Sequence, residues 1–162
     1  MNIQPQVLTD SAYRSGTTLD LLKKYGLSPD QVVLELTEKE AVSDYQSFER
    51  AIDNYRKYGF RIAIDDAGTG YNSLKNIISL KPEFIKLDKF LIRDIYKQPA
   101  QQQLVELLLE FPAQSNTFMI AEGIENVEEL QFLKKIGVHF GQGYALGHPK
   151  PVLKRGMIEA EE

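Results

Sequence analysis

Short apolar segments alternate with longer amphipathic segments along the chain. Most of the short segments are bounded by glycine, proline or polar residues, which is typical of β-strands. Their apolar residues are nearly continuous rather than alternating, so we expect strands with both faces buried, as in a parallel sheet. The six expected strands are Met1–Gln4, Val32–Leu36, Phe60–Ile64, Phe84–Leu87, Phe118–Ala121 and Val138–Tyr144.

Between these strands, apolar residues recur at three- and four-residue steps, which predicts helices with one apolar face. Asn126 followed three residues later by Glu129 predicts a capping box at the start of the last helix. The strand-helix rhythm predicts an α/β fold. The apolar faces consist of Tyr45, Phe48, Ile52 and Tyr55, of Leu104, Leu107, Leu108 and Phe111, and of Val127, Leu130, Leu133 and Ile136, and the glycines expected to end helices are Gly26, Gly59 and Gly137.

The number of βα units leaves two architectures open. The chain has 162 residues, which suggests one domain with room for six such units. A closed (β/α)8 barrel takes about 250 residues, so length alone favours an open, doubly wound sheet. The polar residues at the strand ends, described below, favour the barrel instead.

The composition excludes several classes of protein. Net charge is −4 and the longest basic cluster is Lys134–Lys135, so we expect no binding to polymeric nucleic acid. Cysteine is absent, so disulfides and thiolate sites are excluded. No apolar run has the length of a membrane span, and the N-terminus lacks the pattern of a signal peptide. We therefore expect a cytoplasmic protein without membrane insertion by this chain.

Polar side chains stand at or near the C-terminal end of every expected strand. In parallel α/β sheets and barrels this is the end at which active sites form. A single such residue is explained equally well by a helix cap or a surface ion pair, but that explanation is weak for the whole series. The series is Asn2, Glu35 with Glu38, Asp65 with Asp66, Lys86 with Asp88, Glu122 with Glu125, and Gln142.

Asp65 and Asp66 are the sharpest local feature. Two adjacent carboxylates repel each other and are costly to desolvate, and a divalent cation removes that cost. Hard oxygen ligands suit Mg²⁺ or Mn²⁺, and two such ions can clamp a phosphodiester. Lys86 lies between apolar residues of a strand, so it requires an anionic partner, which is either this cluster, a substrate phosphate or Asp88.

Other candidate motifs are weaker. The loop of Gly68, Thr69 and Gly70 lacks the remaining residues of a phosphate-binding loop, and its glycines are explained by a tight turn. His139 and His148 do not have the spacing of a zinc site. With two histidines in the chain, catalysis through a serine or cysteine nucleophile is not expected.

The motifs VLELTE, IAIDDAGTGYNSL, FIKLD, MIAEGIE and GQGY occur in this order across most of the chain. As a set they resemble the EAL domain, from about Asn2 to Pro151. The resemblance implies an α/β fold that is an incomplete (β/α)8 TIM-like barrel with about six βα units. It also implies hydrolysis of cyclic di-GMP to linear pGpG, with two Mg²⁺ or Mn²⁺ ions.

The resemblance implies roles for particular residues. Asn2 and Glu35 would hold one metal ion, Asp65 would bridge both ions, and Asp66 and Glu122 would hold the second. Ca²⁺ would bind without supporting turnover, because its looser coordination positions oxygens poorly. Lys86 would orient the attacking water or stabilise negative charge, Glu38 would hold the loop of Gly68, Thr69 and Gly70, Gln142 would line the site, and Asp88 and Glu125 would support it.

The sequence also departs from the family pattern. The glutamate that gives the family its name, which would precede Asn2 and bind the first metal, is absent, and Ala67, Gln4 and Asn72 replace the usual residues. A catalytically inactive cyclic di-GMP-binding or protein-interaction module is therefore the alternative function. We expect a partial EAL domain over residues 1–155 and a polar tail over 156–162. Exposed sheet edges predict a homo-oligomer, either a dimer or a strand-exchanged assembly.

Overall fold

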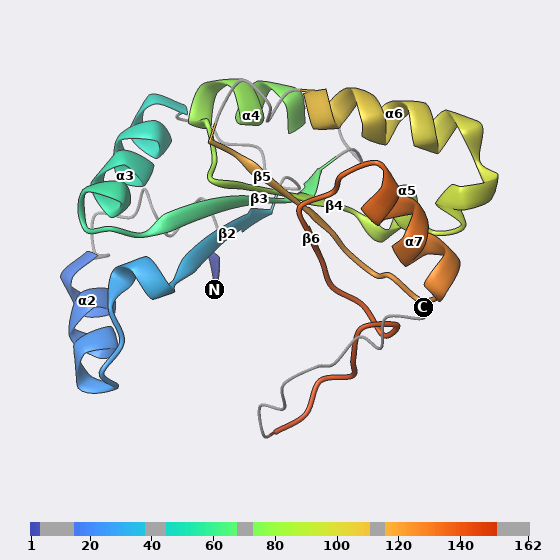
Figure 1. Ribbon diagram of the computed structural model, residues 1–162. Helices are drawn as coiled ribbons and strands as arrows, with labels where there is room; N and C mark the ends of the chain where they lie inside the picture. The colour runs from blue at the N-terminus through green and yellow to red at the C-terminus, as the bar shows by residue number, and fades with distance from the viewer. Residues whose placement is uncertain (4–14, 38–44, 68–72, 111–115, 152–162) are drawn as a thin grey trace. The chain divides into compact units, whose positions relative to one another are not determined.

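The computed structural model describes residues 1–3, 15–37, 45–67, 73–110 and 116–151. The chain divides into two compact units, Met1–Lys86 and Leu87–Glu162, drawn from blue to green and from yellow-green to red in Figure 1. Among the described residues, six strands follow one another in the sheet in the order of the chain, β1-β2-β3-β4-β5-β6. The fold class is α/β, as the strand-helix rhythm predicts.

The first unit contains parallel strands whose register is fixed by backbone pairing. Strand β1 (Asn2–Ile3) pairs with β2 (Val33–Thr37), and β2 pairs with β3 (Arg61–Ala67). Strand β4 (Phe84–Leu87) reaches the boundary of the unit. The helices of this unit are α2 (Ser15–Lys24), the 3-10 turn η1 (Pro29–Gln31), α3 (Tyr45–Lys57) and α4 (Ser73–Leu80).

The core of the first unit forms where α3 packs against the strands. The predicted face of this helix is buried, with Phe48, Ile52 and Tyr55 each at most 3% exposed. These side chains belong to the same cluster as Leu34 of β2 and Ile62 of β3. Full burial of a side chain such as Phe48 or Ile52 stabilises the fold by about 1.5–3 kcal/mol. The apolar packing therefore fixes the strands whose C-terminal ends carry the polar residues.

The second unit begins at Leu87 and contains two further parallel strands. Strand β5 (Phe118–Ala121) pairs with β6 (Phe140–Gly141), and the backbone N–H of Glu122 donates to the carbonyl of Leu87 at 3.2 Å. Its helices are α5 (Lys89–Ile92), the 3-10 turn η2 (Ile95–Lys97), α6 (Pro99–Glu110) and α7 (Val127–Lys135).

Several local predictions are confirmed. Gly26, Gly59 and Gly137 have φ values of 67°, 96° and 84°, the left-handed conformation that ends a helix. The capping box predicted for α7 is present, since Asn126 accepts from the N–H of Glu129 and Glu129 accepts from the N–H of Asn126. The short-range sequence signals were reliable here because each involves residues within one turn of the chain.

The structure differs from the predictions at two elements. In α6 the expected apolar face is wrong, because Leu104 and Leu107 are exposed while Val105 is buried. Strand β6 covers only Phe140–Gly141, and both residues are exposed, although we expected strands buried on both faces. Spacing alone does not show which face of a helix or strand finds a partner.

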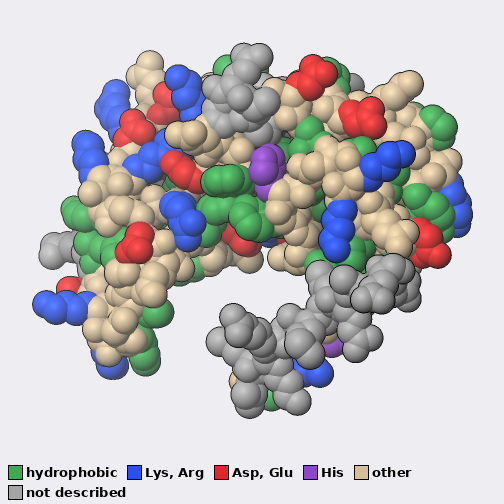
Figure 2. Space-filling view, viewed as in Figure 1, with side chains coloured by type: hydrophobic (Ala, Val, Ile, Leu, Met, Phe, Trp, Pro, Cys, Tyr) green, Lys and Arg blue, Asp and Glu red, His purple; other side chains and the backbone are tan. Residues whose placement is uncertain are grey.

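Charged side chains of both signs are interspersed on the face drawn in Figure 2, without a continuous basic stripe there. No helix in the described ranges is both long enough and apolar enough to cross a membrane.

Candidate active site

The first unit brings Lys86 together with two of the predicted metal ligands. Its Nζ lies 3.2 Å from Oε2 of Glu35 and 3.1 Å from Oδ1 of Asp65. The lysine side chain is only 7% exposed, whereas those of Glu35 and Asp65 are 27% and 14% exposed. A buried ammonium is costly unless it is paired, so this contact supplies the anionic partner that the sequence requires of Lys86.

Strand register explains why these side chains meet. In a strand, residues two positions apart lie on the same face, and directly paired residues of neighbouring strands lie side by side. Asn2 pairs with Glu35 across β1 and β2, and Thr37, two residues beyond Glu35, pairs with Asp65 across β2 and β3. Asn2, Glu35 and Asp65 therefore share one face of the sheet near the C-terminal ends of its strands.

Asp66 has an unusual backbone conformation. Its φ is 58°, in the left-handed region that aspartate tolerates better than most residues with a side chain. The N–H of Asp66 donates to Oδ1 of Asp65 at 3.0 Å, so the neighbouring side chain supports this backbone conformation. Strand β3 extends to Ala67, and both aspartates lie within its last residues rather than after it. Because positive φ interrupts the alternation of a strand, register does not fix the direction of the Asp66 side chain.

The donor set of the first unit fits a hard divalent cation. Two carboxylates flank the ammonium of Lys86, and Asn2 pairs with Glu35 in the neighbouring strand, so the residues that meet here carry the oxygen groups that such a cation prefers. In the described ranges, no group of three or more His, Cys, Asp or Glu side chains is placed so that it could hold a metal ion. A cation bound here would find two carboxylate ligands, Glu35 and Asp65.

The second unit brings together Glu122 and Gln142. Nε2 of Gln142 donates to Oε1 of Glu122 at 2.9 Å. The N–H of Gln142 also donates to the carbonyl of Ala121 at 2.8 Å, which holds the two side chains beside each other. The hydrogen bond from Gln142 fixes the orientation of the Glu122 carboxylate. Metal-binding carboxylates are usually oriented by such a partner.

Glycines allow the loop after β5 to approach its neighbours closely. Gly123 has φ of 66°, and a Cβ at this position would lie 2.7 Å from Cβ of Lys89. A Cβ at Gly143 would lie 2.2 Å from the backbone of Ile124. Since no larger residue fits without a shift of the backbone, these glycines fix the loop that carries Glu122.

A cavity of about 670 Å³ lies in the second unit beside this loop. Tyr144 and His148 stack along one part of its wall, with ring centroids 4.4 Å apart and an interplanar angle of 22°. Lys89, Glu125 and Gln142 add charged and polar groups. The cavity therefore combines planar aromatic surface with groups able to bind polar ligands.

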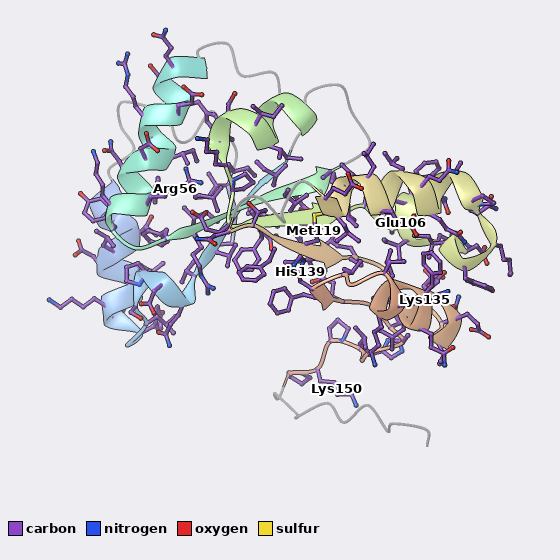
Figure 3. All side chains as sticks on the ribbon, turned by 45° about the horizontal axis from the view of Figure 1, so that its top comes forward. Arg56, Glu106, Met119, Lys135, His139 and Lys150 are labelled. Carbon is purple, nitrogen blue, oxygen red and sulfur yellow. The ribbon has the colours of Figure 1, made fainter. Side chains whose placement is uncertain are left out.

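The remaining predicted residues have varied outcomes. Asp88 caps α5, since its Oδ1 accepts from the N–H of Phe90 at 2.7 Å. Glu38 and the loop of Gly68, Thr69 and Gly70 lie outside the described residues. His139 accepts from the N–H of Met119 at 3.1 Å, and the two labelled residues lie side by side in Figure 3.

Sequence reasoning missed the stacked pair of Tyr144 and His148 and the long-range contact of Glu129 with Asp94. Oε1 of Glu129 accepts from the N–H of Asp94 at 2.8 Å. The capping pattern indicated the local bonds of Glu129, but no local signal reaches a residue 35 positions away.

The fold and the carboxylate-bearing strand ends define a class of protein, and comparisons with known proteins specify it. Residues 1–149 match the family model of the EAL domain. The chain is 34% identical over 152 residues to "Probable cyclic di-GMP phosphodiesterase PdeA" of Escherichia coli, covering 94% of this chain and 21% of that protein. The chain belongs to the EAL domain family.

Solved structures agree with this assignment. Klebsiella pneumoniae BlrP1 in complex with manganese and cyclic di-GMP is 32% identical with a TM-score of 0.85, over 92% of this chain and 38% of that chain. The same protein has been solved with calcium and cyclic di-GMP. The EAL domain of Mycobacterium smegmatis DcpA is 26% identical with a TM-score of 0.85, over 91% of this chain and 66% of that chain. The EAL-type, TIM-like fold predicted from the motifs is confirmed.

The chain spans about a fifth of the length of its relative PdeA and about two thirds of the DcpA domain. The activities of those longer proteins therefore reach this chain only as a proposal.

Proposed function

We propose that this chain takes part in metal-dependent hydrolysis of cyclic di-GMP to linear pGpG. One observation carries the proposal, namely the buried ammonium of Lys86 between Glu35 and Asp65 in a member of the EAL family. Oxygen ligands beside a fixed positive charge suit an anionic phosphodiester and the divalent ions that accompany it.

Each residue has a proposed task. Asn2, Glu35, Asp65 and Asp66 would supply oxygen ligands from the first unit, and Glu122 would supply one from the second. When bound, Mg²⁺ or Mn²⁺ would supply Lewis acidity toward the phosphate and lower the pKa of water. Gln142 would hold the carboxylate of Glu122 through the 2.9 Å hydrogen bond described above.

The overall reaction adds one water molecule to one phosphodiester bond. The water oxygen bonds to phosphorus, the bond from phosphorus to the 3′ oxygen breaks, and a proton goes to that oxygen. Lys86 would place its positive charge beside the negative charge that grows on the phosphate oxygens. Glu38 would support the loop of Gly68, Thr69 and Gly70, while Asp88 and Glu125 would position neighbouring segments.

A second candidate is a module that binds cyclic di-GMP or a protein without turnover. It is favoured by a structural observation, since Glu35 and Asp65 both pair with the buried ammonium of Lys86. In this case the carboxylates would still bind a cation, but the shell would position a water molecule poorly.

Incubation of the purified chain with cyclic di-GMP and Mn²⁺ or Mg²⁺ separates the two candidates. We expect linear pGpG by chromatography, and none with Ca²⁺. Binding by calorimetry without product would support a non-catalytic module that binds cyclic di-GMP. Neither binding nor product would contradict both the enzyme and the cyclic di-GMP-binding module and would leave the protein-interaction module.

Asp65→Asn tests the metal site directly. A ligand that binds only the folded state stabilises it by about 2.7 kcal/mol at about 100 times its Kd. We expect Mn²⁺ to raise the melting temperature of the native chain and of the control Asp53→Asn, which changes a 66% exposed carboxylate on α3. Asp65→Asn should lose this response, and an equal response in all three proteins would show that Asp65 is not a ligand.

A further inference from the structure

We infer that Glu129 is a positioning residue, whose buried carboxylate ties the loop carrying Glu122 and Glu125 to the turn that follows α5. The inference rests on the proposed function, because it assigns Glu129 a task in holding a proposed metal ligand. The tie itself is a structural feature that is measurable without any metal or substrate.

The carboxylate of Glu129 is almost fully buried and accepts hydrogen bonds from three backbone N–H groups. The residue is 1% exposed, and Oε1 accepts from the N–H of Asp94 at 2.8 Å. Oε2 accepts from the N–H of Glu125 at 2.8 Å and from that of Asn126 at 3.4 Å. A buried carboxylate without such donors would strongly destabilise the fold, so all three N–H groups are held toward it.

The capping box explains only part of this arrangement. A capping glutamate needs one oxygen for the backbone N–H at the helix start, which Oε2 supplies here. Oε1 instead reaches Asp94, which lies before η2 and has φ of 55°, a left-handed conformation unusual for a residue with a side chain. The second oxygen therefore fixes a separate turn of the chain.

Contacts on the other side complete the clamp on the β5–α7 loop. The N–H of Ile124 donates to the carbonyl of Gln142 at 3.1 Å, and Gly123 leaves no room for a Cβ beside Lys89. The loop is thus held at Gly123, at Ile124 and, through Glu129, at Glu125. Loss of the last hold would let Glu125 and the preceding residues move, including Glu122 with its partner Gln142.

Glu129→Gln is the sharpest variant. Glutamine has nearly the same volume and occurs in capping boxes, and the bond from the N–H of residue 129 to Asn126 does not involve the changed side chain, so α7 should keep this cap. Its amide has one acceptor oxygen, so either the N–H of Asp94 or the N–H groups of Glu125 and Asn126 lose their acceptor. Asn126→Ala is the matched control, because it removes the side chain that caps the N–H of Glu129 but leaves the bond to Asp94.

Two measurements on the full chain test the inference. Amide hydrogen exchange followed by NMR should be at least about tenfold faster at Asp94 or Glu125 in Glu129→Gln, and unchanged at Asp94 in Asn126→Ala. The apparent Kd for Mn²⁺, measured by calorimetry, should rise about 10- to 100-fold in Glu129→Gln, as is usual when a residue that orients a ligand is changed. In Asn126→Ala the Kd should rise less than about threefold.

Unchanged exchange at the amides of both Asp94 and Glu125 in Glu129→Gln would show that Glu129 does not hold the two segments together. Faster exchange with an unchanged Kd for Mn²⁺, or an equal loss of affinity in both variants, would overturn the positioning role. Failure of the native chain itself to bind Mn²⁺ would count against the proposed function, while the exchange experiment would still decide whether the tie exists.

Discussion

The ion pairs of Lys86 offset negative charge at the strand ends of the first unit. The ammonium has two carboxylate partners at 3.1 and 3.2 Å, so it reduces the repulsion between Glu35 and Asp65. Removal of one partner from such a group is far more costly than removal of an exposed charge. A change at any one of the three residues should therefore alter the electrostatic energy of the other two.

Gly123 is the residue at which backbone conformation and close packing coincide. We expect Gly123→Ala to lower the free energy of unfolding by about 2–4 kcal/mol, of which about 1 comes from the left-handed φ and the rest from the clash with Lys89. Urea unfolding measures the loss. The same variant should weaken Mn²⁺ binding because the loop that bears Glu122 must shift.

Gly26→Ala is the matched control for this prediction. Gly26 has φ of 67°, almost the same as Gly123, but a Cβ there meets nothing within 4 Å. Only the conformational cost of about 1 kcal/mol should remain. Equal losses for the two variants would show that the contact with Lys89 does not matter.

At the scale of elements, α3, α4 and β3 are joined by one arginine. Arg56 of α3 donates to the carbonyls of Leu80 and Lys81 at the end of α4, at 2.7 and 2.9 Å. It also pairs with Glu83 at 3.0 Å, and Glu83 accepts from the N–H of Ile62 in β3 at 2.8 Å. Figure 3 labels this residue on its helix. The network bonds the end of one helix and the start of a strand to a second helix.

Arg56→Met should lower the free energy of unfolding by about 1–2 kcal/mol. Hydrogen bonds to charged groups contribute about 1.5–3 kcal/mol, and the value is reduced here because the arginine side chain is 25% exposed. Chemical denaturation measures the change, and Mn²⁺ affinity should stay the same, since Ile62 lies at the opposite end of β3 from Asp65. Asp53→Asn should cost less than about 0.5 kcal/mol, because its contact with Arg56 is 3.8 Å long and exposed. A large loss of metal binding in Arg56→Met would contradict this division of tasks.

At the scale of the whole molecule, β1 and β6 are the first and last strands of the sheet order. Terminal strands favour pairing with another chain unless they are covered. We expect self-association that increases with concentration, measured by sedimentation velocity. Phe140→Lys, on β6, should weaken it, because charge on an edge strand opposes pairing.

Phe90→Lys provides the control for this experiment. Phe90 is 67% exposed and Phe140 51%, but Phe90 lies on α5 rather than on a strand. Association should therefore persist in Phe90→Lys. A chain that stays monomeric at every concentration would disprove the prediction.

The sequence by itself determined the local elements and the chemical class of the site. The helical spacing of Phe48, Ile52 and Tyr55 and the capping pair of Asn126 and Glu129 depend on neighbours within one or two turns, so they were predicted correctly. The sequence also indicated that the polar residues stand at the C-terminal ends of the strands, and these ends lie at one edge of a parallel sheet.

Only the tertiary structure decided which partners these residues take. In the structure Lys86 pairs with Glu35 and Asp65, and Asp88 caps a helix. Val105 is buried rather than Leu104, and Glu129 accepts a hydrogen bond from Asp94. These contacts join residues far apart in the chain. They depend on how the elements pack and on the backbone register, and local spacing contains neither.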